Sequence, residues 1–335
     1  MENDVLDNVD LFDDPAVFSQ VMLDDIGSAK SYIFLEIYKF GHDSNGTRFR
    51  DLLVKKCSEG VQVKLLLDSW GTPPNPSFFD EISRHGGEVR YFKKIRFFID
   101  FFTKNHRRNH RKLLIIDDKI TYIGSANITA YSMKWRELML RLDGPITPLF
   151  RKSFLDSYKL YRKYIFNKFS FKKTIHYKGF EIIQDLPSIY RQQVKKRYEK
   201  LIKNARHEIV IESPYFIPGY KIRRNMMLAA KRYMGFYYNY NINIHYYQPA
   251  NLHAKCLLVD NEIFAIGSAN FDYRSFRYLH EIVLVGNHKK TVELLRKHLD
   301  VTLDHCVGFN YQSWKRRPLF EKIFGWFLIP FRHLF

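Results

Sequence analysis

The sequence predicts an α/β protein made of two pseudo-symmetric halves, each a mixed β-sheet flanked by helices. One block of fixed residues, H-x-K-x4-D-x6-G-S-A-N, occurs twice, beginning at His110 and at His253. Before each copy, apolar runs typical of buried strands alternate with runs typical of helices. Such self-similarity indicates a duplicated unit. The length of 335 residues also favours about two domains.

The first predicted half covers residues 1–150. Before the first motif we expect, in order, a strand at 33–38, a helix at 48–58, a strand at 61–68, a helix at 76–85 and a strand at 89–92. The motif itself reads as a β-hairpin whose strands, 113–116 and 121–123, flank an Asp-Asp-Lys turn.

The second predicted half covers residues 188–300, with a strand at 209–212 and a helix at 223–233. Gly60 precedes His110 by 50 residues, whereas Gly235 precedes His253 by only 18. The second half is therefore expected to lack about one strand–helix unit, with room for one strand at 242–247. Residues 151–187 are predicted to be a connecting helix and linker.

Charge restricts the possible partners. The chain has 54 basic and 35 acidic residues, a net charge of +19, and 16% of its residues are aromatic. Such a chain attracts polyanions, either nucleic acid or the anionic surface of a cytoplasmic membrane. No apolar stretch approaches the length of a membrane span, and the acidic N-terminus is unlike a secretory signal. The three cysteines are far apart in sequence and suggest a reducing compartment.

The doubled motif predicts one phosphodiester site. Residues two apart on a strand share a face, so His110 and Lys112 point the same way, as do His253 and Lys255. One imidazole can attack phosphorus while the other protonates the leaving oxygen. The ends of the two hairpins add hydroxyl and amide groups as candidate phosphate ligands: Ser125, Asn127, Ser268 and Asn270.

Two further pairs of acidic residues repeat at matched positions. Glu137 lies 27 residues after His110 and Glu281 lies 28 after His253, so we expect these carboxylates to orient the imidazoles. The motif aspartates, Asp117 and Asp260, belong to the same catalytic motifs. Their odd spacing from the lysines favours a role in stabilising each hairpin. The chemistry requires no metal and no cofactor.

At these residues the sequence resembles the phospholipase D superfamily, whose mark is the doubled H-x-K-x4-D. Segments such as Glu212-Ser-Pro-Tyr-Phe-Ile-Pro-Gly219 and Asp272-Tyr-Arg-Ser275 resemble bacterial cardiolipin synthases of the short form without N-terminal transmembrane helices. The resemblance implies two phospholipase D-like halves. It also implies that a phosphatidyl group passes through a phosphohistidine to a glycerol hydroxyl of a second lipid, with phosphatidylglycerol as substrate.

The same resemblance assigns roles within the motifs. His110 becomes the nucleophile and His253 the acid and then the base. Phosphate binding falls to Lys112, Lys255, Asn127 and Asn270.

Other activities remain open at this stage: a phospholipid hydrolase, a nuclease of the same superfamily, or an inactive membrane-binding protein. Two motifs in one chain and an apolar tail favour lipid over nucleic acid. The aromatic and basic tail, 301–335, is a candidate anchor at the membrane interface, and 97–102 is a second candidate. We therefore expect a bacterial protein peripheral to the cytoplasmic side of the cell membrane.

Overall fold

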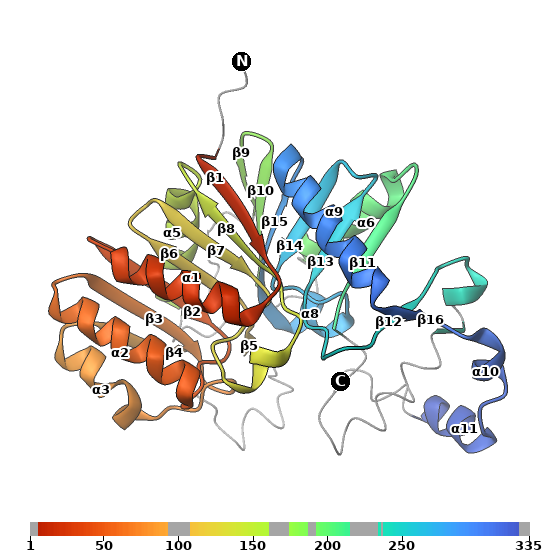
Figure 1. The fold of residues 1–335 in the computed structure, drawn as a ribbon, viewed down its shortest axis with the longest axis horizontal. Coiled ribbons are helices and arrows are strands. Elements are labelled where there is room, and N and C mark those ends of the chain that lie inside the picture. The colour runs from red at the N-terminus through yellow and green to blue at the C-terminus, as the bar shows by residue number, and fades with distance from the viewer. Residues whose placement is uncertain are drawn as a thin grey trace.

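Two β-sheets lie side by side at the centre of the molecule, with helices outside and between them (Figure 1). The computed structural model describes residues 6–92, 108–160, 174–186, 192–214, 234–235 and 237–327. The predicted helix at 223–233 and the apolar segment at 97–102 lie outside these residues.

The first sheet is mixed and has seven strands. In spatial order they are β1 (Asn8–Phe12), β8 (Met139–Asp143), β7 (Ile120–Gly124), β6 (Leu113–Ile116), β2 (Tyr32–Ile37), β3 (Gln62–Asp68) and β4 (Glu88–Phe92). β2, β3 and β4 run parallel, and the other neighbours pair antiparallel. The predicted strands are confirmed to within one residue or so at their ends.

Three helices pack their apolar faces on the outer side of this sheet: α1 (Pro15–Ser28), α2 (Ser44–Ser58) and α3 (Pro76–Arg84). The first two begin at an aspartate, Asp14 and Asp43, whose side chain accepts a backbone N–H of the first turn. These caps fix where the helices start and so where each strand-to-helix loop ends.

The second sheet repeats the first, strand for strand, over most of its width. In spatial order its strands are β9 (Thr174–Tyr177), β10 (Phe180–Asp185), β15 (Leu279–Gly286), β14 (Ile263–Gly267), β13 (Cys256–Val259) and β11 (Ile209–Glu212). Helix α6 (Gln193–Asn204) covers the outer face of this sheet. β10, β15, β14, β13 and β11 correspond to β1, β8, β7, β6 and β2. The described residues add no strand beyond β11, where the first sheet has β3 and β4. Residues 215–233, which follow β11, lie outside the described part of the chain, so the shortening stays a prediction.

The structure divides the chain differently from the predicted boundaries. Residues 174–185, expected to be part of a linker, form β9 and β10 of the second sheet. β10 pairs with β15 over six residues, and Ile182 and Ile183 are buried, because the strand lies between β15 and β9 within the sheet. α5 (Thr147–Leu160) crosses the boundary predicted at 150.

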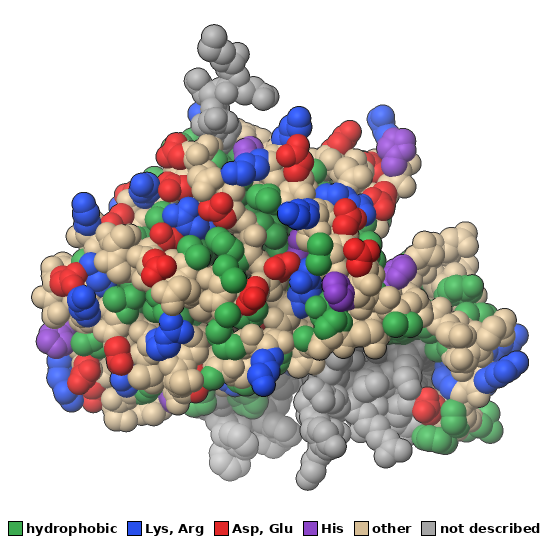
Figure 2. All heavy atoms as spheres, in the orientation of Figure 1, with side chains coloured by type: hydrophobic (Ala, Val, Ile, Leu, Met, Phe, Trp, Pro, Cys, Tyr) green, Lys and Arg blue, Asp and Glu red, His purple; other side chains and the backbone are tan. Residues whose placement is uncertain are grey.

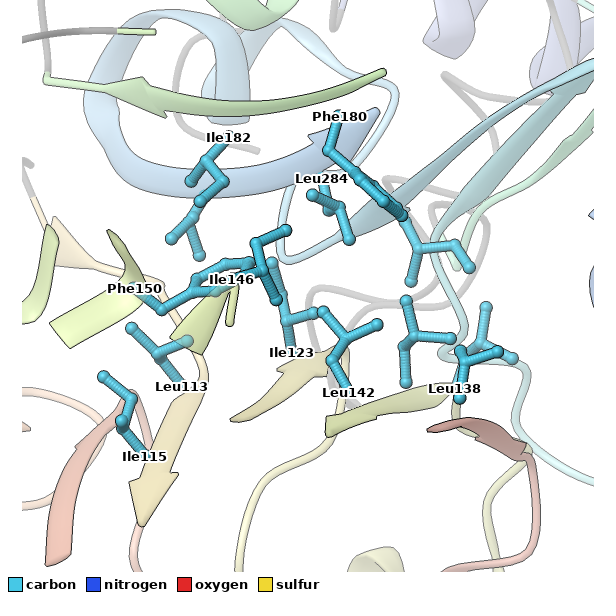
Figure 3. Packing of buried hydrophobic residues seen from close by; sticks show 14 of the residues in the cluster. Leu113, Ile115, Ile123, Leu138, Leu142, Ile146, Phe150, Phe180, Ile182 and Leu284 are labelled. Atoms are coloured by element: carbon cyan, nitrogen blue, oxygen red, sulfur yellow. The ribbon is translucent and has the colours of Figure 1, made fainter. Parts of the chain in front are cut away.

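One hydrophobic core joins the two halves. It contains residues of both sheets, of α5 and of α9 (Lys289–Asp304). Figure 3 shows Phe180, Ile182 and Leu284 of the second half packed against Ile123, Ile146 and Phe150 of the first half. Burying these side chains between the sheets fixes how the two motifs face each other.

The remaining elements lie at the edges. β5 (Arg108–Asn109) crosses from the first half to pair parallel with β15, and η1 (Tyr131–Lys134) and α8 (Tyr273–Tyr278) follow the two G-S-A-N segments. The predicted strand at 242–247 is β12 (His245–Tyr247), which pairs with β16 (Cys306–Gly308) outside the main sheet. α10 (Tyr311–Lys315) and α11 (Leu319–Phe327) extend away from the body (Figure 1). No helix among the described residues is long and apolar enough to cross a membrane.

Candidate active site

Each motif lies on one hairpin of its own sheet, and the two motif histidines meet where the halves join. The strands β6–β7 and β13–β14 form the hairpins, and each histidine lies just before the first strand. In both copies the lysine Nζ donates to the carbonyl oxygen of the motif histidine, at 2.7 Å in Lys112–His110 and 2.5 Å in Lys255–His253. The lysine side chains are almost fully buried. The local geometry of the two copies is therefore the same.

Each imidazole is held by a carboxylate from the opposite half. The distance from His110 Nδ1 to Glu281 Oε1 is 3.0 Å, and His253 Nδ1 lies 2.8 Å from both oxygens of Glu137. The sequence correctly selected both glutamates, but matched offsets along the chain could not show that the pairs cross between the halves. A carboxylate on Nδ1 leaves Nε2 of each ring for the substrate.

The main chain crosses in the same way. The N–H of His110 donates to the carbonyl of His280 at 3.0 Å, and the N–H of His253 donates to the carbonyl of Arg136 at 2.7 Å. His280 and Arg136 immediately precede Glu281 and Glu137. Each histidine is thus fixed through both its backbone and its ring by one dipeptide of the other half.

The motif serines hold the glutamates rather than an open phosphate site. The Oγ of Ser125 donates to Glu137, and the Oγ of Ser268 donates to Glu281. Both serines are fully buried, and each Oγ also accepts the backbone N–H of the residue after its glutamate. The expectation that these serines bind phosphate directly is wrong for this arrangement, because their single protons are already donated to carboxylates.

The two asparagines differ. Asn127 is partly exposed, and its Oδ1 accepts the N–H of Lys39 at 3.2 Å. Asn270 is 1% exposed, and its Nδ2 lies 3.1 Å from the Oγ of Ser275. The partly exposed Asn127 is the better placed of the two to reach a ligand.

The motif aspartates anchor the hairpins. Asp117 accepts the backbone N–H groups of Lys30, Ser31 and Tyr32. Asp260 accepts three N–H groups of the corresponding segment, from Arg206 to Glu208. Both aspartates have a φ of 53° at the hairpin turn. The structure places them away from the histidines, in the stabilising role that the spacing indicated.

Burial and mutual repulsion among the cationic groups shift the pKa values in the site. Burial lowers the pKa of Lys112 to about 7 and that of Lys255 to about 8, and each lysine is close enough to act on the opposite motif. Burial also lowers the pKa of His253 to about 4 and the pKa of His110 well below its ordinary value. The charge of His253 contributes to lowering the pKa of His110, so the two rings share one electrostatic environment.

The two glutamates differ in charge. Burial raises the pKa of Glu281 to about 8. Burial would raise the pKa of Glu137 as well, but the charge of His253, its hydrogen bond and Lys255 outweigh burial and lower it. At neutral pH, Glu137 is the carboxylate that favours an imidazolium beside it.

Two aromatic side chains without a predicted role border the histidines. The ring of Tyr38 lies 5.3 Å from that of His110, and the ring of Trp135 lies 5.2 Å from that of His253. Tyr38 follows strand β2 and Trp135 precedes Glu137 by two residues, so closeness in sequence to Glu36 and Glu137 was the available signal.

One group of buried donors among the described residues could hold a metal ion. Ligand atoms of Glu212, Cys256 and His298 all lie within 4.8 Å of one another. Nε2 of His298 and Oε2 of Glu212 are already hydrogen-bonded at 2.6 Å, and burial raises the pKa of the Cys256 thiol well above its ordinary value. A metal would have to displace the proton that joins the first two groups.

Comparisons with known proteins agree with this geometry. Residues 22–157 and 227–302 match the family model described as "Cardiolipin synthase, PLD-like domain". Cardiolipin synthase 1 of Staphylococcus epidermidis is 30% identical, over 93% of this chain and 71% of its own length. A cardiolipin synthase of Listeria welshimeri is 33% identical, over 86% of this chain and 67% of its own.

Solved structures match the fold over nearly the whole chain. A phosphatidylserine synthase from Haemophilus influenzae superposes with a TM-score of 0.76 at 12% identity, covering 98% of this chain and 95% of its own. A polyphosphate kinase from Porphyromonas gingivalis gives a TM-score of 0.62 at 12% identity, covering 99% of this chain and 54% of its own. At such identities the likeness concerns the fold alone.

Proposed function

Since this chain belongs to the cardiolipin synthase family with phospholipase D-like domains and is a phosphatidyltransferase, we propose that it converts two phosphatidylglycerol molecules into cardiolipin and glycerol. The observation that carries the proposal is the crossed pairing of two histidines and two glutamates around one buried, cationic site. Such a site provides a nucleophile, a proton donor and positive charge for a single diester.

In the proposed first step, Nε2 of neutral His110 attacks the phosphorus of one phosphatidylglycerol. A P–N bond forms as the P–O bond to glycerol breaks, and His253 gives its proton to the departing glycerol oxygen. In the second step, His253 takes the proton from a glycerol hydroxyl of the second lipid. That oxygen attacks phosphorus, the P–N bond breaks, and cardiolipin leaves.

The different charges of the two glutamates support these roles. Ionised Glu137 opposes the burial that lowers the pKa of His253 to about 4, so the imidazolium that a proton donor requires is less costly at His253 than it would be beside a neutral carboxyl group. Glu281, whose pKa is about 8, gives His110 no comparable negative charge at neutral pH, so His110 keeps the lone pair needed for attack. Lys112 and Lys255 would balance the charge of the non-bridging oxygens.

The protein is further proposed to work on the cytoplasmic face of a bacterial membrane. Exposed aromatic residues lie beside the segments that lead into the two motifs. Tyr131, 48% exposed, packs on Trp135, and Trp70, 57% exposed, lies under Arg108. Aromatic and basic side chains together suit a membrane interface rich in anionic lipid.

Helix α11 supplies a second proposed contact. Leu319, Phe320 and Ile323 are each more than half exposed. Figure 2 shows apolar side chains on this projecting segment, whereas acidic and basic side chains are interspersed over the body. Helix α11 is therefore proposed to lie in the interface rather than to cross the bilayer.

The decisive experiment incubates the full chain with phosphatidylglycerol vesicles and identifies the products. Cardiolipin with an equal amount of glycerol is expected. Phosphatidic acid as the main product would make the protein a hydrolase, and no product would reject catalysis on this lipid. Replacing Leu319, Phe320 and Ile323 together by serine should weaken sedimentation with these vesicles; unchanged sedimentation would reject α11 as a contact.

A further inference from the structure

A partly buried polar network behind His253 has no part in the chemistry described above. It contains Asp13 after β1, Arg136 before β8, Glu212 at the end of β11 and His298 on α9. His298 lies between two carboxylates, with Nδ1 at 2.9 Å from Asp13 and Nε2 at 2.6 Å from Glu212. Hydrogen bonds of this kind to charged groups are strong when they are shielded from water.

Arg136 connects this network to both halves of the molecule. Its Nη2 lies 2.9 Å from Asp13 Oδ2, its Nε donates to Thr302 Oγ1 at 2.8 Å, and its Nη2 also donates to the carbonyl of His298 at 3.3 Å. The side chain is 13% exposed. Its guanidinium therefore joins the first half to helix α9 of the second.

The backbone of Arg136 carries the segment that leads into His253. Its carbonyl accepts the N–H groups of His253 and Ala254, at 2.7 and 3.1 Å, and its own N–H donates to the carbonyl of Asn251 at 2.9 Å. The next residue, Glu137, holds the His253 ring. The position of Arg136 thus determines both contacts that hold His253, its backbone hydrogen bond and its ring contact with Glu137.

The corresponding support of His110 is built differently. His110 follows strand β5, which has two register pairs with β15, whereas His253 follows a single bridge between Leu252 and Arg136. The residue at the position of Arg136 is His280, which packs on the ring of Phe92. With less strand pairing, the segment before His253 depends more on a fixed side chain behind it.

We propose that Arg136 is a positioning residue, which holds residues 251–254 so that His253 meets Glu137 in the catalytic geometry. The expected fall in kcat rests on the proposed phosphatidyl transfer, whereas the expected displacement of His253 does not. Loss of the guanidinium frees the Arg136 backbone to move, and a catalytic histidine displaced by even 1 Å loses much of its rate.

The test compares Arg136→Met with Arg141→Met in the full chain. Arg141 is a matched control because it is also 13% exposed and paired with carboxylates, but its partners Asp10 and Asp25 belong to the first half. Arg136→Met should lower kcat on phosphatidylglycerol roughly tenfold or more while KM changes less than about twofold. Arg136→Lys should recover part of the loss, and Arg141→Met should leave kcat unchanged even if it lowers Tm.

A second readout does not need turnover. In protein labelled with ¹⁵N-histidine, Arg136→Met should shift the ring resonances of His253 and leave those of His110 in place. If wild type has no activity but this shift occurs, the proposed function fails and the positioning role stands.

Three results would overturn the role. These are an unshifted His253 in Arg136→Met, an equal fall of kcat in both methionine variants, and stoichiometric zinc that is lost in Cys256→Ser. The last result would make a metal ion, rather than the arginine, the organiser of this network.

Discussion

The two halves of the molecule are alike where they reach the substrate and differ behind it. Both copies place a lysine on the carbonyl of the motif histidine and a serine on the motif glutamate. One layer further from the site, Glu36 of the first half pairs with Arg111 at 3.2 Å, whereas Glu212 at the corresponding position pairs with His298. The proposed chemistry uses both copies of the inner residues, whereas the outer residues only have to hold them in place.

The crossed glutamates explain why the inner symmetry requires both halves in one structure. Neither half alone contains a motif histidine held by a carboxylate, because each supplies that carboxylate to the other. The shared core between the sheets therefore sets the distance over which these pairs form.

Replacing the motif histidines should have the largest effect on kcat and tests whether the two histidines have equivalent roles. His110→Ala and His253→Ala should each lower kcat by roughly 10³-fold or more, because one removes the proposed nucleophile and the other the proposed proton donor. The halves should differ in what accumulates. In His253→Ala, a phosphatidyl adduct is expected on His110, detected by mass spectrometry of the peptide that contains it. An adduct on His253 in the His110→Ala protein would reverse the roles.

Replacing the two glutamates should lower kcat by different amounts. Glu137→Gln removes the charge that stabilises the His253 imidazolium and should lower kcat by roughly 10²-fold, whereas Glu281→Gln should cost only about tenfold. Steady-state kinetics at neutral pH measures the difference. Equal losses would mean that the two carboxylates carry the same charge. Histidine NMR should show Glu281→Gln acting on His110, and an effect confined to His253 would contradict the crossed pairing.

The sequence predicted most of this site, because the motif, its hairpin and the glutamates repeat at fixed spacing. Strands β6 and β11 have the predicted ends, 113–116 and 209–212. The crossing of the pairs was not predictable, because spacing along the chain does not tell which half a side chain faces. The assignment of 174–185 to the second sheet was missed because partners more than 90 residues away in the chain define that strand.

The two motif lysines should lose their charge, and with it their affinity for an anion, over different pH ranges. With pKa values of about 7 and 8, Lys112 and Lys255 lose their charge as pH rises, so they bind an anion best below pH 7. The dissociation constant of glycerophosphoglycerol, a diester whose charge is constant over this range, should rise roughly tenfold from pH 6 to 9. Calorimetry measures it. Lys112→Arg should remove the part of the rise near pH 7, and Lys255→Arg should reduce the part near pH 8, where ionisation of Glu281 also weakens anion binding; identical profiles would show that the halves titrate together.

The smallest expected effects belong to the aspartates of the hairpin turns. Asparagine tolerates the left-handed backbone at Asp117 and Asp260, so Asp117→Asn and Asp260→Asn remove mainly the charge. Each carboxylate accepts three backbone N–H groups, and each variant should lower Tm at pH 7 by a few degrees without changing kcat per folded molecule. A loss of kcat without a loss of Tm would show that these aspartates act in catalysis rather than in stabilising the hairpins.

The pH dependence of the Asp260 variant shows whether charge is the cause. Hydrogen bonds from the N–H groups of Glu208, Arg206 and His207 lower the pKa of Asp260 below its ordinary 3.8. A lowered carboxylate pKa gives stability that is complete well above 3.8 and is lost as pH falls through the folded value. The Tm difference between wild type and Asp260→Asn should therefore be full at pH 7 and shrink below about pH 4. A constant difference down to pH 3 would mean that hydrogen-bond geometry, rather than charge, fastens the second hairpin.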